Sequence, residues 1–577
     1  MKTKNKTRII ATALALFSLA YAGNSQSLKW DKIVNGSQNS TDKGYAVAVD
    51  DSANVYMTGY EQNSSTGFDI VVVKYNSSGT QKWLRTYSGS LSSTVVERGN
   101  CIALDANHNV FVAGTAYNGA NNNDFCLLKW SSGGVFDNTH YPKFYADASG
   151  TEVPEAKSVV VVSTTAVYVS GSTYDVTNGW KLLVEKDNVG GNGWDATFTA
   201  YTYQGSLITT RHEANDLRAD ANYVYVTGVY ANNTEGTNCV TAKINASSGS
   251  QSWAATYNTS TYDNCSNALS VDGNNNVWIA GYSNTASTGK DALIIEYNSG
   301  GTQQWATTYN GANNLDDVWN DIALFPGGGS TIAGVTGFKT INATAGSYDK
   351  DYITATYNSS GNLWASWSTN PKTYNGSKAA PESAITDEAW AIEYSNNRLY
   401  VSGRSFETPT EMDITTIGYT PSNGTQAWIN SYTYNSSNGQ DEMFNKYGLY
   451  ALYNGTYCVD EIYVVGDAQT SNAEDCVTLK YSCISCNPCR LANPNQLEAG
   501  FFPNPFSSSA TLRINQETIV NNATLKIYDL SGKVVLVNTE INNNEITIER
   551  SSMATGIYFY ELTDESRIIA SGKFAIE

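Results

Sequence analysis

A strand-length phrase that ends in glycine recurs eight times in this 577-residue chain. The first copy reads Asn54-Val55-Tyr56-Met57-Thr58-Gly59. The copies close on Gly59, Gly114, Gly171, Gly228, Gly281, Gly334, Gly403 and Gly466. Self-similarity at a steady period indicates that each copy is one supersecondary unit, whose apolar faces are covered only when neighbouring copies stack on it. The array of copies is therefore the folding unit.

Each copy predicts four short strands. In the first copy they fall at 44–50, 54–59, 68–75 and 81–87, rich in Val, Ile, Tyr and Trp and separated by Asp, Asn, Ser and Gly. Four short antiparallel strands per repeat are typical of a propeller blade. We therefore predict an all-β, eight-bladed β-propeller, with a seven-bladed ring containing one degenerate copy as the structural alternative.

The two ends of the array complement each other. The eighth copy has its third strand at 476–481, but no Trp-bearing fourth strand follows it, whereas 28–33 is an orphan strand that carries Trp30. Pairing of 28–33 into the last blade would join the ends of the ring and remove exposed strand edges.

Residues 28 to 482 resemble the SBBP-type propeller repeats of secreted bacterial proteins. The resemblance implies architecture and no single activity.

The N-terminus predicts export. Residues 1–22 combine four basic residues with the short apolar run 9–17 and the small-x-small sequence Ala20-Tyr21-Ala22, which is typical of a signal peptide cleaved between Ala22 and Gly23. Cleavage changes the formal net charge from -19 to -23, because the removed segment has no acidic residue. Such a surface disfavours nucleic acid as a partner. No segment approaches the ~20 apolar residues of a transmembrane helix, so we expect a secreted or outer-membrane surface protein.

From residue 499 the sequence pattern changes. About six or seven alternating strands predict a small β-sandwich. The segments 502–506, 523–535 and 556–562 resemble the type A C-terminal sorting domain of the type IX secretion system of Bacteroidetes. The matching residues are Pro503, Asn504, Pro505, Asp529, Gly532, Lys533, Gly556 and Tyr558. The resemblance implies the type IX machinery as a partner, and tail removal with release or surface anchoring. The domains are then a signal peptide (1–22), a propeller (23–482), a Cys-containing linker (483–498) and a sorting domain (499–577).

Nine cysteines in an exported chain allow disulfides with one thiol left over. The sequence-local pairs are Cys101 with Cys126, Cys239 with Cys265, and Cys458 with Cys476. Cys483, Cys486 and Cys489 form a Cys-x-x-Cys-x-x-Cys run that lacks a fourth ligand for zinc or an iron–sulfur cluster. We favour disulfide stapling of the linker, because exported thiols tend to oxidise.

Metal-binding patterns are sparse. The three histidines, His108, His140 and His212, form no paired ligand motif. Turns between the first and second strands resemble the first half of a calcium loop but lack its bidentate acid. The candidate calcium ligands are Asp105, Asn107, Asn109, Asp272, Asn274 and Asn276. Asp and Asn also stabilise turns by bonding their own backbone, and we favour that interpretation, with no cofactor expected.

Acidic residues provide the only candidates for catalysis. One set recurs before the third strands and predicts a structural role at blade corners, namely Asp69, Asp124, Asp291, Asp351, Asp413 and Asp475. A second set interrupts the repeat pattern at the starts of two first strands, namely Asp316, Asp317, Asp321, Asp387 and Glu388. A hydrolase would need one such cluster at a single pocket.

We therefore expect a binding or structural surface module with no catalytic residues, whose ligand is a glycan or a surface protein bound where loops converge at one end of the central channel. The alternative is an extracellular polysaccharide- or peptide-active enzyme with carboxylates on the propeller rim.

Overall fold

The computed structural model describes residues 27–484 and 499–577 apart from short gaps at 39, 90–95, 120–122, 146–151, 207–208, 233–235, 260–261, 312–313, 345–346, 377–385, 409–410, 435–440, 444, 455–458, 471–472, 515–522, 530–532, 552 and 565–566. The chain divides into two compact units. The first covers residues up to 453 and 460–484, and the second covers 485–577 together with 454–459. The predicted signal peptide and its cleavage site at Ala22 and Gly23 lie outside the described residues.

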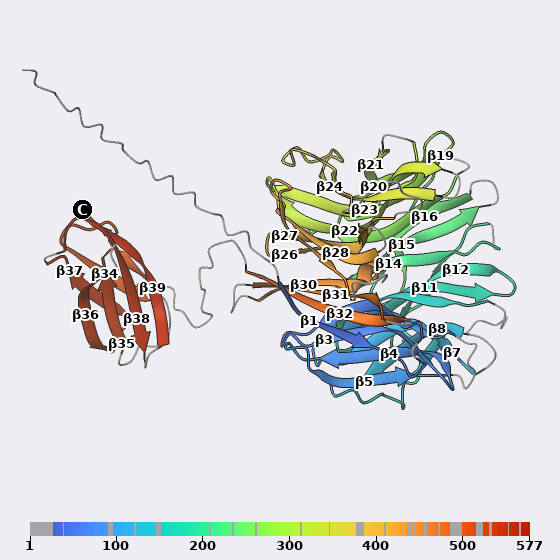
Figure 1. The fold of residues 1–577 in the computed structure, drawn as a ribbon, viewed down its shortest axis with the longest axis horizontal. Coiled ribbons are helices and arrows are strands. Elements are labelled where there is room, and N and C mark those ends of the chain that lie inside the picture. The colour runs from blue at the N-terminus through green and yellow to red at the C-terminus, as the bar shows by residue number, and fades with distance from the viewer. Residues whose placement is uncertain are drawn as a thin grey trace, which may run out of the picture. The chain divides into compact units, whose positions relative to one another are not determined.

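The described part of the first unit contains eight four-stranded antiparallel sheets, which we number in chain order (Figure 1). Sheets 1 and 2 comprise β2 (Lys43–Val49), β3 (Val55–Asn63), β4 (Gly67–Tyr75), β5 (Gln81–Tyr87), β6 (Arg98–Leu104), β7 (Val110–Tyr117), β8 (Asn123–Trp130) and β9 (Lys143–Tyr145). Sheets 3 and 4 comprise β10 (Glu155–Ser163), β11 (Ala166–Asp175), β12 (Gly179–Lys186), β13 (Tyr201–Tyr203), β14 (Glu213–Ala219), β15 (Tyr223–Asn232), β16 (Gly236–Asn245) and β17 (Gln251–Tyr257). Sheets 5 and 6 comprise β18 (Asn264–Val271), β19 (Val277–Thr285), β20 (Gly289–Tyr297), β21 (Gln303–Tyr309), β22 (Asp317–Gly327), β23 (Ser330–Thr344), β24 (Ser347–Asn358) and β25 (Lys372–Tyr374). Sheet 7 comprises β26 (Glu388–Ser395), β27 (Arg398–Thr408), β28 (Glu411–Tyr419) and β29 (Gln426–Tyr432).

Sheet 8 combines the two ends of the first unit. It contains β30 (Leu449–Asn454), β31 (Val459–Gln469) and β32 (Glu474–Ile484), preceded by the 3-10 helix η1 (Lys446–Gly448), and β1 (Ser27–Val34) pairs with β32 as its outer strand. The register aligns Trp30 with Lys480 and Ile33 with Val477. The predicted pairing of 28–33 into the last repeat is therefore present (Figure 1).

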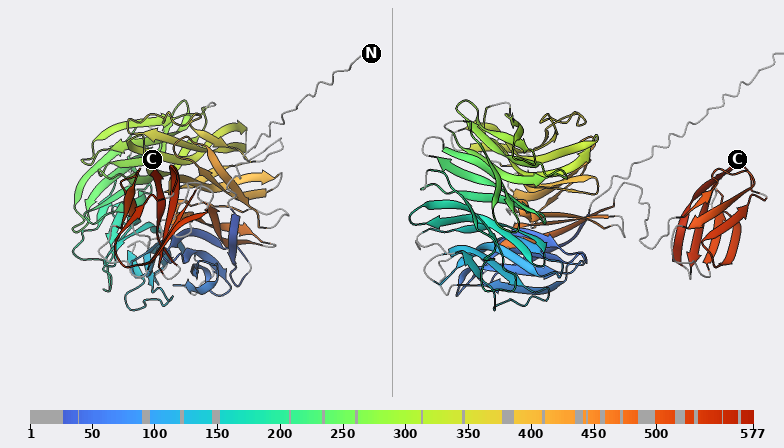
Figure 2. Two further views of the ribbon diagram at one scale, coloured as in Figure 1. Left: turned by 90° about the vertical axis from the view of Figure 1, so that its left-hand side faces the viewer. Right: turned by 180° about the vertical axis from the view of Figure 1, so that it is seen from behind.

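The sheets form a closed, propeller-like ring. The first strands contact one another in chain order from β2 to β26, and η1 contacts both β26 and β2. Figure 2 shows the sheets arranged around a common centre. Separate hydrophobic clusters fill the interfaces between consecutive sheets, as when Tyr168 of sheet 3 packs with Leu217 and Val226 of sheet 4. Each sheet thus buries its apolar faces against its neighbours, as repeat architectures require.

A β-bulge in the first strand explains the repeated glycine. In sheets 1 to 7 the register shifts by one residue at Tyr45, Asn100, Lys157, Asn215, Asn267, Asn320 and Trp390. The bulge brings a backbone carbonyl so near the second strand that a Cβ on Gly281 would lie 1.9 Å from the Cys265 oxygen. In sheet 6 the equivalent glycine is Gly337, 1.9 Å from the Val318 oxygen, and not Gly334 as the repeat suggested.

Five tryptophans each link one sheet to the next, four of them in the outermost strand of a sheet and Trp367 in the loop before β25. Trp253 donates its Nε1–H to the Ser299 carbonyl at 3.0 Å, and its ring faces Gly301, whose φ is +84°. The equivalent donors and acceptors are Trp30 and Ser77, Trp83 and Ser132, Trp305 and Ser359, and Trp367 and Pro421. Only glycine readily adopts this backbone conformation and leaves room for the ring. The pair Trp30 and Ser77 connects sheet 8 to sheet 1.

The second unit contains two antiparallel sheets around one hydrophobic core. One sheet has the order β33 (Ala499–Phe502), β34 (Ser509–Ile514), β37 (Glu545–Glu549). The other has the order β36 (Val534–Ile541), β35 (Ala523–Tyr528), β38 (Gly556–Asp564), β39 (Arg567–Ile576). Leu512 from the first sheet and Leu525 and Phe574 from the second are buried in the same cluster. Among the described residues of the chain, no helix is long and apolar enough to cross a membrane.

Candidate functional site in a pocket lined by the first strands

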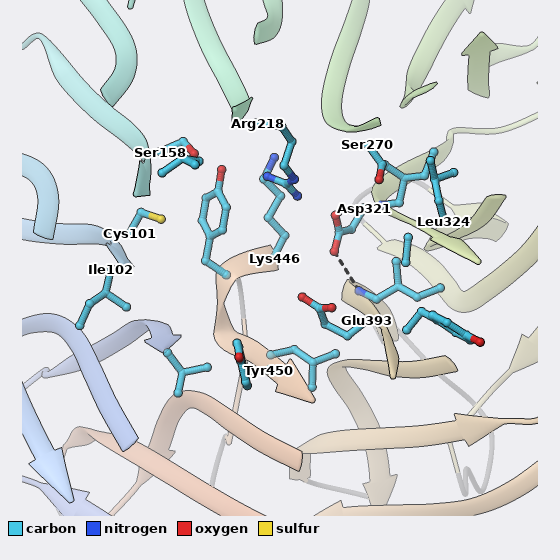
Figure 3. A pocket seen from close by; sticks show the side chains of 18 of the residues that line it. Cys101, Ile102, Ser158, Arg218, Ser270, Asp321, Leu324, Glu393, Lys446 and Tyr450 are labelled. Carbon is cyan, nitrogen blue, oxygen red and sulfur yellow. Dashed lines mark hydrogen bonds between the residues drawn. The ribbon is translucent and has the colours of Figure 1, made fainter. Parts of the chain in front are cut away.

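The inner strands line one pocket with a volume of about 380 Å³. Its wall combines apolar residues such as Ile102 and Val160 with the charged residues Arg218, Asp321 and Glu393. Figure 3 shows Arg218, Ser270, Asp321 and Glu393 on one side, with Cys101 and Ile102 on the opposite side. The exposed lining is more polar than apolar, so a ligand held here would need polar groups of its own to pair with the charged side chains of the pocket.

The segment around η1 inserts into the pocket from sheet 8. Lys446 directs its Nζ to the carbonyl oxygens of Asn215 at 2.9 Å and Asn267 at 2.5 Å. Asn445 donates its Nδ2–H to the carbonyl of Asn100 at 3.3 Å. All three acceptors are bulged residues, so this segment bonds to the first strands of sheets 2, 4 and 5 where their ladders are interrupted.

Asp216 is the centre of a compensated charge network. Its carboxylate accepts from Arg218 Nη1 at 2.7 Å, from the Tyr447 hydroxyl at 2.9 Å and from the Leu269 amide at 2.9 Å, and Lys446 Nζ lies 3.3 Å away. Although burial opposes ionisation, the cations of Arg218 and Lys446 hold the pKa of Asp216 below its ordinary value. Asp216 is therefore a structural anion that positions Arg218 and Lys446.

Asp321 and Glu393 differ in their partners. Asp321 accepts backbone N–H groups of Ile322 and Ile392, each at 2.9 Å, and the second of these bonds joins sheet 6 to sheet 7 (Figure 3). The Glu393 carboxylate makes no hydrogen bond or ion pair with any described residue. Burial raises the pKa of both groups to about 7, and for Glu393 the neighbouring Asp321 adds to this effect.

The polar side of the pocket departs from the repeat. In each first strand, one residue pairs with the repeated glycine, and we compare the position four residues after it. Sheets 1, 2, 3 and 6 have an apolar residue there, namely Ala48, Ala103, Val160 and Ala323. Sheets 4, 5 and 7 have a polar or charged residue there, namely Arg218, Ser270 and Glu393. Of this site, sequence reasoning named Asp321 as a candidate acid and Cys101 only as half of a possible disulfide. An alignment of the repeats on the bulge would have identified Arg218 and Glu393 as exceptions.

The expected rim cluster does not form one site. Asp387 accepts the Gly376 amide at 2.9 Å and the Phe406 amide at 2.6 Å, and Asp317 accepts the Gly311 amide at 2.5 Å. Asp316 accepts the Lys290 amide at 3.0 Å, and Glu388 binds Arg404 at 2.7 Å and also Lys350. These four acids therefore belong to separate structural contacts.

Asp317 and Asp387 also follow the repeat, contrary to our interpretation. Asp42, Glu97 and Asp441 lie at the same position before or at the start of a first strand, and each accepts amides from the preceding loop and from the second strand. In sheet 4 this position is taken by His212, whose Nδ1 lies 3.1 Å from the Gly205 amide and whose Nε2 lies 3.3 Å from the Ala231 amide, and a neutral ring accepts only one of the two. The sequence signal for this repeated position is a glycine, or Tyr434 in sheet 8, shortly before the acceptor residue. We missed it because the acceptor is not an acid in every sheet: in sheet 4 it is His212.

The candidate calcium ligands are engaged in turns. Asp272 Oδ1 accepts the amides of Asn274 at 2.8 Å and Asn276 at 2.9 Å, and Asn276 Nδ2 donates to Asp272 Oδ2 at 3.0 Å. Asp105 accepts the amides of Asn107 at 2.9 Å and Asn109 at 2.8 Å. Backbone amides occupy one oxygen of each carboxylate and an Asn side-chain amide occupies the other, as in a self-stabilised turn. Within the described residues, no group of three or more His, Cys, Asp or Glu side chains is placed to hold a metal.

The acids predicted to precede the third strands lie within those strands, near their starts. Asp69 Oδ2 accepts from Asn63 Nδ2 at 2.9 Å and from Thr66 Oγ1 at 2.5 Å, and Asp291 Oδ2 accepts from Thr288 Oγ1 at 2.9 Å. Asp124 accepts from Asn118. These contacts are local and recur from sheet to sheet.

Two predicted disulfides are absent. Cys101, Cys126, Cys239, Cys265 and Cys476 are free thiols. Cys101 and Cys126 belong to sheet 2 but pack in clusters on its opposite faces, which separates their sulfur atoms. The Cys265 thiol instead bonds to Asn267 Oδ1 at 3.2 Å. Cys458, Cys486, Cys489 and the side chain of Cys483 lie outside the described residues.

The sorting-motif residues support the core and the strand ends of the second unit. Asn504 Oδ1, between Pro503 and Pro505, accepts the Ala575 amide at 2.8 Å. Asp529 and Lys533 pair at the end of the β35–β36 hairpin, where Lys533 N–H donates to Asp529 Oδ1 at 3.1 Å. Gly556 begins β38, on which Tyr558 stacks with Phe574, and Gly532 lies outside the described residues.

Residues 500–577 match the family model of the secretion system C-terminal sorting domain. The sorting domain implies interaction with the type IX secretion machinery and export to the cell surface or the medium. No curated protein matches the chain.

Solved structures match over long stretches at low identity. The extracellular domain of a putative hybrid two-component system from B. thetaiotaomicron shares 11% identity over 92% of this chain and 72% of that chain, with a TM-score of 0.26. An ulvan lyase shares 10% identity over 78% and 98% of the two chains, with a TM-score of 0.34. A putative 6-phosphogluconolactonase from Bacteroides fragilis shares 9% identity over 71% and 97%, with a TM-score of 0.35. TM-scores this low support no conclusion about this chain.

Proposed function

We propose that the exported protein is an eight-bladed β-propeller of the SBBP-repeat type that acts as a binding module, with its ligand site in the pocket lined by the first strands. The closed cycle of first-strand contacts and the pairing of β1 with β32 support one blade per sheet. The domains are a signal peptide at 1–22, the propeller at 23–482, a linker at 483–498 and a sorting β-sandwich at 499–577.

The observation that carries the binding function is the departure from symmetry inside the pocket. A scaffold built from equal repeats would present equivalent residues around its centre. Instead, Arg218, Ser270 and Glu393 replace small apolar residues on one side only. Polar side chains at positions that need none for packing favour recognition of a single ligand.

The sorting domain delivers this module. Export through the inner membrane by the signal peptide is followed by passage through the outer membrane, after which the tail is removed and the propeller is released or anchored at the surface. The chain without its signal peptide, at a formal net charge of -23, favours neutral, zwitterionic or cationic ligands over nucleic acid. A glycan or a surface protein with such a group fits this setting.

A second function, hydrolysis, is favoured by one observation. Asp321 and Glu393 line the same pocket, and both have pKa values raised to about 7, a range suited to general acid–base chemistry. The two backbone amides that hold Asp321 argue for a positioning role. In this second function, Asp321 and Glu393 of the pocket take the catalytic roles that we considered, from the sequence, for the carboxylates of the propeller rim.

A glycan and peptide array tests the proposal. The mature chain, residues 23–577, is applied with and without calcium, and the wells are assayed for released products. We expect retention without products, reduced in Glu393→Gln and unchanged in the control Glu545→Gln, because Glu545 is an exposed residue of the sorting domain. Products that disappear in Glu393→Gln would establish the enzyme instead. Retention that is equal in both variants would exclude the pocket as the binding site.

A further inference from the structure

Two opposite charges face the pocket without meeting. Arg218 uses Nη1 for Asp216 and for the Leu217 carbonyl, at 2.7 and 2.9 Å, whereas its Nε and Nη2 bond to no described residue. Glu393 has no hydrogen-bond or ion-pair partner among the described residues, and no ion pair within 4.0 Å joins it to Arg218. The two groups nevertheless lie near enough to influence each other electrostatically. Both side chains line the pocket, and Figure 3 shows Asp321 and Lys446 between them.

The Arg218 and Glu393 groups select for a ligand that carries both charges. A guanidinium with two unused donors suits a carboxylate, and an unpaired carboxylate suits an ammonium group. A purely anionic ligand would leave the Glu393 carboxylate unpaired. A purely cationic ligand would leave the Nε and Nη2 donors of Arg218 unpaired. Groups left unpaired after desolvation reduce affinity.

The opposite wall defines the rest of the ligand. Sheets 1 to 3 contribute the aliphatic side chains Val47, Ile102, Val159 and Val160 to the lining, together with Cys101 and Ser158. An aliphatic substituent would gain burial there at about 25 cal/mol per Å². The volume of about 380 Å³ suits a molecule the size of an amino acid or a dipeptide.

We propose that this pocket binds a small apolar zwitterion, an α-amino acid or short peptide, with its carboxylate on Arg218 and its ammonium group on Glu393. The inference rests on the proposed binding function and names the ligand class for the same site. Lys446 and Tyr447 are not free to take this role, because their polar atoms are bonded to Asn215, Asn267 and Asp216.

Isothermal titration calorimetry of residues 23–577 tests the ligand class. The probes are L-leucine, the dipeptide Ala-Leu, N-acetyl-L-leucine, which lacks the ammonium group, and L-leucinamide, which lacks the carboxylate. We expect at least one of the two zwitterions to bind about tenfold or more tightly than both blocked compounds, which corresponds to about 1.4 kcal/mol. Equal binding of all four compounds, or binding of none, overturns the proposal.

Two variants assign the charges. Glu393→Gln should remove the preference for a zwitterion over N-acetyl-L-leucine, and Arg218→Gln should remove the preference over L-leucinamide. Glu393→Gln keeps the shape of a side chain with no internal partner, so it remains informative even if loss of the Asp216 contact unfolds Arg218→Gln. Glu545→Gln should bind as the unmodified chain does. If an array ligand binds in a Glu393-dependent way while L-leucine and Ala-Leu do not bind, the zwitterion proposal is refuted and the binding function stands. If no Glu393-dependent array ligand is found and the two zwitterions also fail to bind, both proposals are refuted.

Discussion

Replacing Trp30 tests whether the contact between sheets 8 and 1 stabilises the closed ring. Its indole is 8% exposed, donates to the Ser77 carbonyl at 3.2 Å and covers Gly79. Removing a buried tryptophan side chain costs about 3–5 kcal/mol. We therefore expect Trp30→Ala to lower the free energy of unfolding of residues 23–577 by that amount, measured by urea titration with circular dichroism.

Trp428 provides a matched control. It is 7% exposed, but its indole N–H has no hydrogen-bond partner among the described residues. Replacement by phenylalanine makes the same change of ring at both sites, and only Trp30→Phe also removes a hydrogen bond. Because Lys480 still bonds to the Ser77 carbonyl at 3.0 Å, the extra loss at Trp30 should be about 1 kcal/mol. Equal losses for the two phenylalanine variants, or a Trp30→Ala variant as stable as the unmodified chain, would refute the closure argument.

Three further predictions concern the bulge, the buried acids and the sorting domain. Gly281→Ala should destabilise the ring by at least about 1–3 kcal/mol, since its Cβ would lie 1.9 Å from the Cys265 oxygen, and thermal melting that matches the unmodified chain would contradict the bulge argument. Burial raises the pKa of Glu97 to about 7 and those of Asp317 and Asp475 to about 6, above their ordinary values of 4.5 and 3.8. The folded state therefore binds protons more tightly, and the stabilisation is lost as pH rises through 6 to 7, so the melting temperature should fall between pH 5 and pH 8; an increase would oppose it. Deletion of 499–577 should prevent the propeller from reaching the cell surface or the medium of the native host, judged by immunoblotting of cell fractions, and normal surface levels would speak against the role of the sorting domain.

The strand order was readable from the chain because it depends on local chemistry. Each repeat alternates apolar runs with Asn, Ser and Gly turns, and the lone Trp30 strand complements the unfinished last copy. Both signals reside within a few consecutive residues. The sorting motif was recognisable for the same reason, and the family match at 500–577 confirms it.

The pocket was not readable, because its residues come from different repeats. Arg218, Asp321, Glu393 and Lys446 are far apart in sequence, and ring closure brings them together. The roles of Asp317 and Asp387 were misjudged because their amide partners lie on neighbouring strands and loops. Side-chain chemistry alone does not tell a structural carboxylate from a catalytic one.

The sequence by itself determined the repeat, the strands within it and the export tail, since turn residues, apolar alternation and short motifs act over a few residues. Tertiary structure alone decided that the second strand continues beyond the repeated glycine, why that position needs a glycine, which thiols can meet and which charges share a pocket. Those features depend on bulged carbonyls, sheet faces and distances across the ring, and these are fixed only when all the sheets pack together.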